Sequence, residues 1–328
     1  MYAKKYCCTL FDSNYMPLGL ALYESMRRHF PDFHLWILAL DDECYDKLSS
    51  SNLENVTVMR LSEVEEADVL EAKGNRTWQE YCWTLGSVLT WYVLRENPEL
   101  DHISYLDSDI CFFSSPEPIY EEIGDKSIMI VPHRFPPRLE HLAENGIYNV
   151  EMVFFRRDEQ GQACLEEWRD NCVEWCYYKI EKDRLGDQKY LDKWPGKYSN
   201  THILRHLGAG VALWNIEQYD VRPENGNLIL DGQPLIFYHY HKFKYFDGGF
   251  YISGLKDYGF SDKFLPFYRP YVKSLNKLTS KYSVGARKLD TREFAKHVRY
   301  ELRSETTLGR MKIKIMDFAL RVRDALRR

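Results

Sequence analysis

The chain alternates between short apolar runs and longer segments in which apolar residues recur every three or four positions. Residues 6–12, 34–40 and 55–59 are apolar runs of strand length, and the first two end at or just before aspartates. The segment after the first run has helical spacing, and Ser13 or Asn14 could cap it. This alternation predicts strands that are each followed by a helix.

The same pattern continues through the middle of the chain. Residues 77–95 are typical of a long helix closed by Asn97 and Pro98. Further strands are expected over residues 103–106, 128–132 and 148–156, and a further helix over residues 162–179. Strands and helices that alternate favour an α/β fold, with a mostly parallel sheet and helices on both faces.

The pattern changes from about residue 246. Residues 246–290 are rich in aromatic residues with weak periodicity, and two helical stretches follow at 291–302 and about 306–328. The last stretch carries an apolar stripe at helical spacing: Leu308, Met311, Ile315, Phe318, Val322 and Leu326. We expect one α/β unit over residues 1–245, an extension over 246–305 packed on it, and a basic amphipathic helix over 306–328.

Composition adds limits to this picture. The chain has 328 residues and 45% hydrophobic content, enough for a sizeable core. It lacks an apolar run of about 18 residues, so we expect no transmembrane helix. The eight cysteines show no zinc-type spacing, which favours core thiols in a reduced, cytoplasmic protein.

The charge is unevenly distributed. The net charge is −5, but residues 242–328 hold 21 Lys and Arg against 9 Asp and Glu. A basic amphipathic helix at 306–328 can lie on an anionic membrane surface, at the inner face of the membrane, or it can pack on the body or on a second subunit. Nucleic-acid binding is not expected, because no recognition module accompanies the basic residues.

Two carboxylates mark the first candidate site. Asp107 and Asp109 stand between two apolar runs, where acids are costly to bury unless their charge is compensated. Mg²⁺ and Mn²⁺ prefer oxygen ligands and often take one or two carboxylates plus substrate phosphates. The alternative is a turn with two solvated acids.

A second candidate follows a strand-like run near residue 237. On a strand, His239 and His241 would share one face, and neutral imidazole is a good ligand for Mn²⁺. Lys242 and Lys244 could neutralise a departing diphosphate. The alternative is a pair of edge histidines in an aromatic cluster.

Two further polar pairs could border a ligand. Gly186 could open a helix with Asp187 and Gln188 in its first turn, where the carboxylate could bind a sugar or acceptor hydroxyl. The alternative is a helix-start acid stabilised by the helix dipole. Asn149 and Glu151 open an apolar strand and could face a ligand or simply form a strand-entry turn.

Taken together, these segments resemble the GT-A glycosyltransferases, and more closely the retaining group around glycogenin and the bacterial lipopolysaccharide galactosyltransferases. They are also similar to bacterial nucleotide-diphospho-sugar transferases found among surface-polysaccharide genes. The matching segments are residues 8–12, 40–42, 105–109, 148–150, 186–188 and 239–241. The resemblance spans about residues 5–245 and implies a GT-A, Rossmann-like fold.

The resemblance also implies roles for the candidate residues. A Mn²⁺ or Mg²⁺ ion would be held by Asp107, Asp109 and His239, with His241 as the alternative third ligand. The donor nucleotide would contact Thr9, Asp12, Asn14, Tyr15 and Asp107, with Lys242 or Lys244 at the diphosphate. Asp187 and Gln188 would sit by the donor sugar, and Asn149 and Glu151 on the acceptor side. Glu151 departs from the related pattern, which usually has a small residue, often glycine, at that position.

The implied function is a metal-dependent transfer of a sugar from a nucleotide-diphosphate sugar, a UDP-sugar by default, to a glycan or lipid-linked glycan in bacterial surface-polysaccharide synthesis. The Asp187–Gln188 pair favours retention of configuration, whereas inversion would need Asp187 or Glu151 as a base. A nucleotidyltransferase would usually show a glycine-rich phosphate loop near the first strand, which the sequence lacks. A non-catalytic sugar-binding protein on the same fold stays open.

Overall fold

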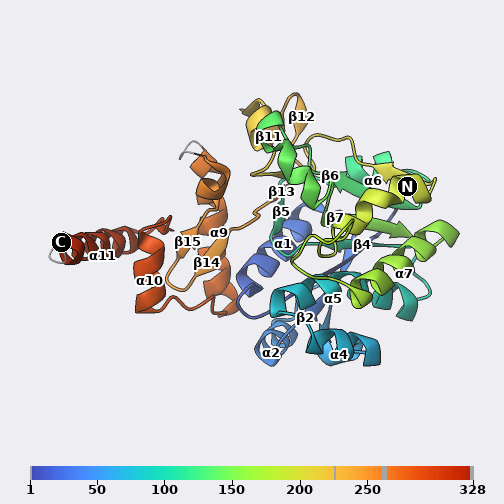
Figure 1. The fold of residues 1–328 in the computed structure, drawn as a ribbon, viewed down its shortest axis with the longest axis horizontal. Coiled ribbons are helices and arrows are strands. Elements are labelled where there is room, and N and C mark those ends of the chain that lie inside the picture. Colours follow the sequence, from blue (N-terminus) through green and yellow to red (C-terminus); the bar gives the residue numbers. More distant parts are fainter. Residues whose placement is uncertain (1, 225–226, 261–263, 326–328) are drawn as a thin grey trace.

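A seven-stranded sheet forms the centre of the molecule, in the order β3-β2-β1-β4-β7-β6-β8 (Figure 1). The computed structural model describes residues 2–224, 227–260 and 264–325. The strands are β1 (Lys5–Phe11), β2 (Phe33–Ala39), β3 (Val56–Arg60), β4 (His102–Leu106), β6 (Ile128–Pro132), β7 (Tyr148–Arg156) and β8 (Thr201–Ile203). In this sheet β7 runs antiparallel to both of its neighbours, and the other pairs are parallel. The predicted mostly parallel sheet is confirmed.

Helices cover both faces of the sheet because neighbouring residues of a strand point to opposite sides. Cys8 packs in a core with α5 (Trp78–Glu96) and α7 (Glu159–Glu174). Cys7 packs in a second core with α1 (Met16–His29), α2 (Asp42–Ser50) and α6 (Glu117–Ile123). All eight cysteines are free and six are buried, which confirms the core thiols for those six. The α/β prediction is therefore correct.

Short helices connect these elements, and some helix ends differ from the predictions. The connectors are α3 (Leu61–Val64), α4 (Ala67–Gly74), η1 (Pro137–Asn145), η2 (Lys189–Lys193), α8 (Trp194–Lys197) and η3 (Ile216–Gln218). The N-cap of α1 is Tyr15, not Ser13 or Asn14. Helix α7 begins after Asp158, whose side chain accepts from Gly161 N, and it ends where Trp175 turns extended, so the expected span of 162–179 was wrong at both ends.

A small second sheet lies against the carboxyl end of β4. It contains β5 (Ile110–Phe112), β13 (Phe237–His239) and β9 (Val211–Ala212), with β13 in the middle. The antiparallel register of β5 and β13 places Ile110 opposite His239. Beside it, β10 (Val221–Glu224), β11 (Asn227–Leu230) and β12 (Gln233–Pro234) form a separate antiparallel sheet. The second sheet thus brings residue 239 next to the turn that follows β4.

The extension contains one long helix that the sequence pattern did not predict. Helix α9 (Leu265–Tyr282) spans 18 residues with Pro270 in its interior, and a proline there usually indicates a break. Its buried residues share a core with Leu18 and Ala21 of α1, so this helix packs on the body. The remaining elements here are β14 (Lys244–Phe246), β15 (Phe250–Ile252), η4 (Leu255–Tyr258) and β16 (Arg303–Ser304).

Two helices form the end of the molecule farthest from the sheet (Figure 1). They are α10 (Thr291–Val298) and α11 (Thr307–Ala325), close to the predicted stretches 291–302 and 306–328. The last part of the predicted helix, residues 326–328, lies outside the described residues. In the described part of the chain, no helix combines the length and the apolar character that a membrane span needs.

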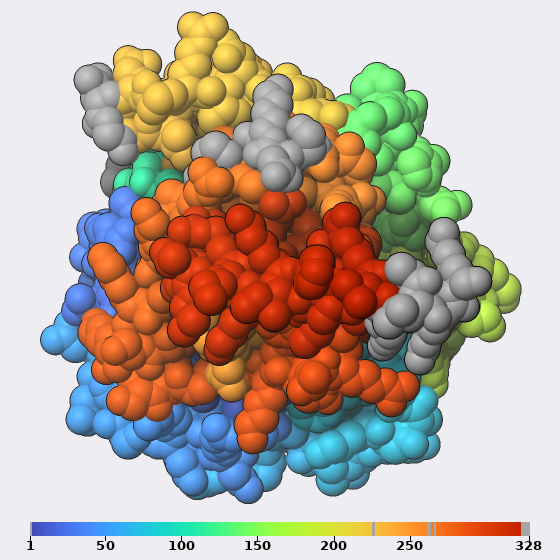
Figure 2. Space-filling view, turned by 90° about the vertical axis from the view of Figure 1, so that its left-hand side faces the viewer, coloured from blue at the N-terminus to red at the C-terminus, as the bar shows by residue number. Residues whose placement is uncertain are grey.

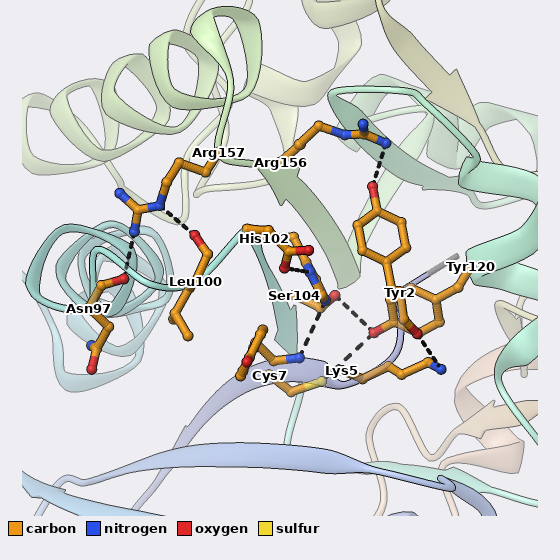
Figure 3. Close-up of polar contacts among 12 residues, drawn as sticks. Tyr2, Lys5, Cys7, Asn97, Leu100, His102, Ser104, Tyr120, Arg156 and Arg157 are labelled. Carbon is orange, nitrogen blue, oxygen red and sulfur yellow. Dashed lines mark hydrogen bonds and ion pairs between the residues drawn. The ribbon is translucent and has the colours of Figure 1, made fainter.

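A polar network secures the start of β4 (Figure 3). Arg157 donates to the main-chain carbonyls of Leu94, Asn97 and Leu100, which close α5 and lead into β4. At the start of the strand, the fully buried His102 ring has its Nδ1 atom 2.6 Å from Asp101 Oδ1. These contacts of Arg157 and Asp101 hold the chain in place where β4 begins. The strand then leads from this fixed start to the candidate site.

Candidate metal and donor site

The two aspartates stand in the turn between β4 and β5. Asp107 directly follows β4, and its N–H donates to the carbonyl of Glu151 on β7 at 2.9 Å. The carbonyl of Asp109 accepts from the N–H of Tyr240, just past β13, also at 2.9 Å. The turn is therefore fastened to both sheets, and its two carboxylates have a defined position.

His239 completes a group of three possible metal ligands. Its Nε2 atom lies 3.0 Å from Asp109 Oδ1 and 3.8 Å from Asp107 Oδ2. One ligand atom from each of the three residues lies within 4.8 Å of the others. Because the last residue of β13 pairs with the first residue of β5, the histidine reaches this turn from a distant part of the sequence. The structure thus brings together the three residues that were predicted as ligands.

The charges of the site fit a divalent cation. Burial and the nearby Asp107 raise the pKa of Asp187 to about 8. Burial, together with the neighbouring Asp109, likewise raises the pKa of Asp107 despite the opposing effect of His239. Negative charge is thus crowded here, and a cation would relieve it. Two carboxylates and an imidazole are ligands that Mn²⁺ accepts, so the residues fit the expected ion.

His241 is not part of the three-residue group. Strand β13 ends at His239, so the two histidines do not continue along one strand face as predicted. The His241 ring lies 5.6 Å from the His239 ring and packs edge-on against Trp214. Burial and the nearby His239 lower the pKa of His241 to about 3, so its ring is neutral. Between the two predicted histidines, the structure favours His239 as the ligand.

The two lysines lie farther along the chain, and both are exposed. Lys242 has a left-handed backbone (φ 61°), and its Nζ lies 3.7 Å from Asp257 Oδ2. Lys244 is the first residue of β14 and pairs with Ile252 in that hairpin. The structure therefore places them on the extension side of the cluster, and their predicted diphosphate role stays a prediction.

The predicted nucleotide residues surround the end of β1. Thr9 is fully buried, and its hydroxyl has no hydrogen-bond partner among the described residues. Asp12 follows β1 and accepts from the N–H of Tyr15 and from Asn14 Nδ2. Partial burial, with the carboxylates of Asp109 and Asp12, raises the pKa of Tyr15 to about 12. Tyr15 and Asp12 thus lie on the same side as Asp109 of the candidate metal cluster.

A chain of hydrogen bonds links the predicted sugar-side residues. Asn149 Nδ2 donates to Gln188 Oε1 and to His133 Nε2, each at 3.0 Å, and Gln188 Nε2 donates to the carbonyl of Asn145. Gln188 is the N-cap of η2 and Asp187 precedes it, so the expected helix opened by Gly186 was wrong. The structure brings Asn149, Gln188 and Asp187 to one side of the cluster.

Glu151 occupies a different position from the one expected. Its side chain is fully buried, and Oε2 lies 2.8 Å from Nδ1 of His239. It therefore lies against the Nδ1 side of the histidine ring and is closed off from solvent, and its predicted place on the acceptor side stays a prediction.

Sequence reasoning missed two residues of this region. His133 follows β6 and stacks on Phe135 with ring centroids 4.6 Å apart. Trp214 follows β9 and touches His133, His239 and His241 edge-on. A polar residue at the carboxyl end of a strand was a usable signal for His133. Strand β9 has only two residues, so the sequence there has no hydrophobic periodicity that could have predicted the strand or the position of Trp214 after it.

Comparison with known proteins identifies relatives. No model of a known protein family matches the chain. The uncharacterized protein YfnD of Bacillus subtilis is 34% identical over 227 residues, which cover 68% of this chain and 73% of YfnD. The chain belongs to the YfnD family. YfnF of the same organism is 29% identical to this YfnD-family chain over 245 residues, covering 72% of the chain and 81% of YfnF.

A solved structure shares the fold. The glycosyltransferase GlyE of Streptococcus pneumoniae TIGR4 superposes with a TM-score of 0.50 at 14% sequence identity. The match covers 87% of this chain and 65% of the GlyE chain, so the chain spans slightly less than two thirds of that protein's length. At this identity the likeness shows the fold alone. This member of the YfnD family therefore has the GT-A fold, as the sequence predicted.

Proposed function

We propose that this chain is a metal-dependent glycosyltransferase that moves a sugar from a UDP-sugar to a hydroxyl of a glycan or lipid-linked glycan. The Asp107–Asp109–His239 cluster at the carboxyl end of β4 carries the proposal. The fold supports the reaction class, since GlyE is a glycosyltransferase with this fold. The catalytic unit is residues 1–245, on which the extension packs.

The proposed cofactor is Mn²⁺ or Mg²⁺, held by Asp107, Asp109 and His239. A bound divalent cation supplies charge stabilisation for the diphosphate of the donor and of the leaving nucleotide. Asp12 and Tyr15 border this position and are the proposed contacts for the nucleoside, with the buried Thr9 beneath them.

The protein's own contribution to the reaction is positioning. Gln188 is fixed at both ends of its amide, by Asn149 Nδ2 and by the carbonyl of Asn145. A fixed amide beside the donor sugar can hold the sugar in the geometry that the acceptor hydroxyl must attack. Asp187, which lies close to Asp107, is the proposed partner for a sugar hydroxyl.

We propose retention of configuration. Inversion requires a base on the acceptor side, and the sequence offered Asp187 and Glu151 for that role. The buried Glu151 carboxylate bonds His239, so it has no access to an acceptor. Asp187 is half-buried and remains the candidate base for the inverting alternative. The configuration of the product distinguishes the two mechanisms.

The proposal extends to the setting of the reaction, which is bacterial surface-polysaccharide synthesis on the cytoplasmic side of the membrane. Five apolar residues of α11 are exposed: Leu308, Met311, Ile315, Phe318 and Val322. Figure 2 looks onto the end of the molecule that carries this helix, and α11, in red, lies across the middle of that face. Basic residues accompany the apolar row, as in helices that lie on anionic membranes.

A panel of nucleotide sugars with Mn²⁺ tests the proposed function. A donor that binds the folded protein raises its thermal stability by mass action. The selected donor is then followed for release of its nucleotide with candidate glycan acceptors. A donor that binds and turns over supports the proposal. A donor that binds without turnover supports the sugar-binding alternative, and no binding to any donor contradicts both.

A further inference from the structure

Glu151 is a carboxylate buried in the middle of the structure. Its side chain has no exposed surface, and it stands on β7 beside the end of β4. The backbone on both sides is held, because its N–H donates to Asn149 Oδ1 at 2.8 Å and its carbonyl accepts from Asp107 N–H at 2.9 Å. A carboxylate in such a place needs a strong partner.

That partner is His239. The Glu151 Oε2 atom lies 2.8 Å from His239 Nδ1, and Oε1 has no hydrogen-bond partner among the described residues. The chain makes room for the carboxylate at Gly210, where a Cβ atom would lie 2.9 Å from Oε1 and 2.4 Å from Val131 Cγ1. Gly210 also has φ of +71°, which favours glycine.

This hydrogen bond determines which nitrogen the ring offers to the cluster. A neutral imidazole carries its proton on one nitrogen and a free lone pair on the other. With a metal ion bound, Nδ1–H would donate to Glu151 and the Nε2 lone pair, beside Asp109 Oδ1 at 3.0 Å, would be left for the ion. Metal-binding histidines usually donate their second N–H to a carboxylate or carbonyl in this way.

We propose that Glu151 is a positioning residue for the metal site: it holds His239 in the Nδ1–H form and aims Nε2 at the ion. It is not itself a ligand, because Asp107, Asp109 and His239 form the compact group without it. The inference rests on the metal site of the proposed function. It also assigns a role to the residue that replaces the usual small residue of related glycosyltransferases.

The test is Mn²⁺ binding without any donor, measured by the electron paramagnetic resonance signal of free Mn²⁺. Replacement of such supporting groups typically weakens metal binding about 10- to 100-fold. We expect Glu151→Gln, which keeps an acceptor oxygen, to weaken binding about 10-fold, and Glu151→Leu to weaken it further, toward 100-fold. Pulsed measurements of the bound ion should show ¹⁴N coupling from His239 in the wild type and in Glu151→Gln, and its loss in Glu151→Leu.

Glu301→Gln is the matched control, because Glu301 is a buried carboxylate that bonds Ser253 in the extension. It should leave the Mn²⁺ Kd and the ¹⁴N coupling unchanged. The inference is overturned if the wild type and both Glu151 variants have the same Mn²⁺ Kd and the same ¹⁴N coupling. It is also overturned if the wild type binds no Mn²⁺. If the wild type binds Mn²⁺ as expected but transfers no sugar, the proposed function fails and this inference stands.

Discussion

His239 and Asp109 are far apart in the sequence, yet His239 Nε2 lies 3.0 Å from Asp109 Oδ1. The contact exists because β13 pairs with β5, which places His239 opposite Ile110. Behind the ring, Glu151 binds the other nitrogen at 2.8 Å. The candidate site is thus assembled from β4 and β7 of the large sheet and from β5 and β13 of the small one.

Substitution of Gly210 should disturb the space that Glu151 occupies. In Gly210→Ala, the new Cβ would lie 2.4 Å from Val131 Cγ1 and 2.9 Å from Glu151 Oε1, at a φ of +71°. We expect the free energy of unfolding to fall by about 2–4 kcal/mol, from overpacking and backbone strain together. Urea denaturation measures this loss.

Gly232→Ala is the control for backbone strain alone. Gly232 also has positive φ (+87°), but among the described residues no atom lies within 4 Å of the position of a Cβ. It should cost about 1 kcal/mol. An equal loss of unfolding free energy in both variants would show that the close approach to Val131 and Glu151 does not affect stability.

Gln188→Ala tests the proposed donor-sugar side of the site. The variant removes the amide held by Asn149 and Asn145 and leaves the side chains of Asp107, Asp109 and His239 in place. We expect turnover of the donor to fall about 100-fold, since loss of positioning near the reacting atoms is costly, and the Mn²⁺ Kd to stay constant. Steady-state kinetics and Mn²⁺ titration measure the two quantities.

Gln162→Ala is the comparison for this variant, because Gln162 is an exposed glutamine of α7 and should have no effect on either quantity. Unchanged turnover in Gln188→Ala would remove Gln188 from the proposed donor site.

Arg157→Lys tests the polar network in Figure 3. The lysine keeps the charge but loses the fork with which arginine reaches the carbonyls of Leu94, Asn97 and Leu100. We expect a loss of about 1–3 kcal/mol in the free energy of unfolding, because carbonyls at the end of α5 lose their donors. Arg321→Lys, at an exposed site on α11, should change stability by less than about 0.5 kcal/mol. Similar values for both variants would contradict the role given to Arg157.

Phe318→Asp tests the proposed membrane contact. Phe318 is 70% exposed on α11, so the change should leave the folded structure intact. We expect the protein to sediment with vesicles that contain anionic lipids, and the variant to lose about 10-fold in that binding, because it removes apolar area and adds a negative charge. Tyr178→Asp, at another exposed aromatic on the body, should bind as the wild type does. If the wild-type protein stays in the supernatant, the proposed membrane contact of α11 is wrong.

Much of the central fold could be predicted from the sequence. The sequence predicted β4, and with it the positions of Asp107 and Asp109, because the apolar run ends abruptly at acidic residues. The two-faced sheet followed from strands and helices in alternation. These signals are local, so they do not depend on which strands become neighbours.

The parts that depend on long-range pairing could not be predicted. Strand β7 lies antiparallel beside β4, and this pairing places Glu151 next to His239. The order of strands in the sheet cannot be predicted from a local sequence pattern. The choice of His239 over His241 likewise depends on where β13 ends. Helix α9 was missed because Pro270 indicates a break, whereas packing on α1 stabilises the helix in spite of it.

The most direct test of the account is nucleotide release from the selected UDP-sugar, with and without Mn²⁺, in the wild type and in Asp109→Asn. We predict turnover that requires the ion, stops with a chelator, and falls at least about 100-fold in the variant, because one ligand charge is lost from the cluster that is proposed to hold the ion at the donor phosphates. Turnover that persists without a divalent ion, or that is equal in wild type and variant, would contradict the central claim.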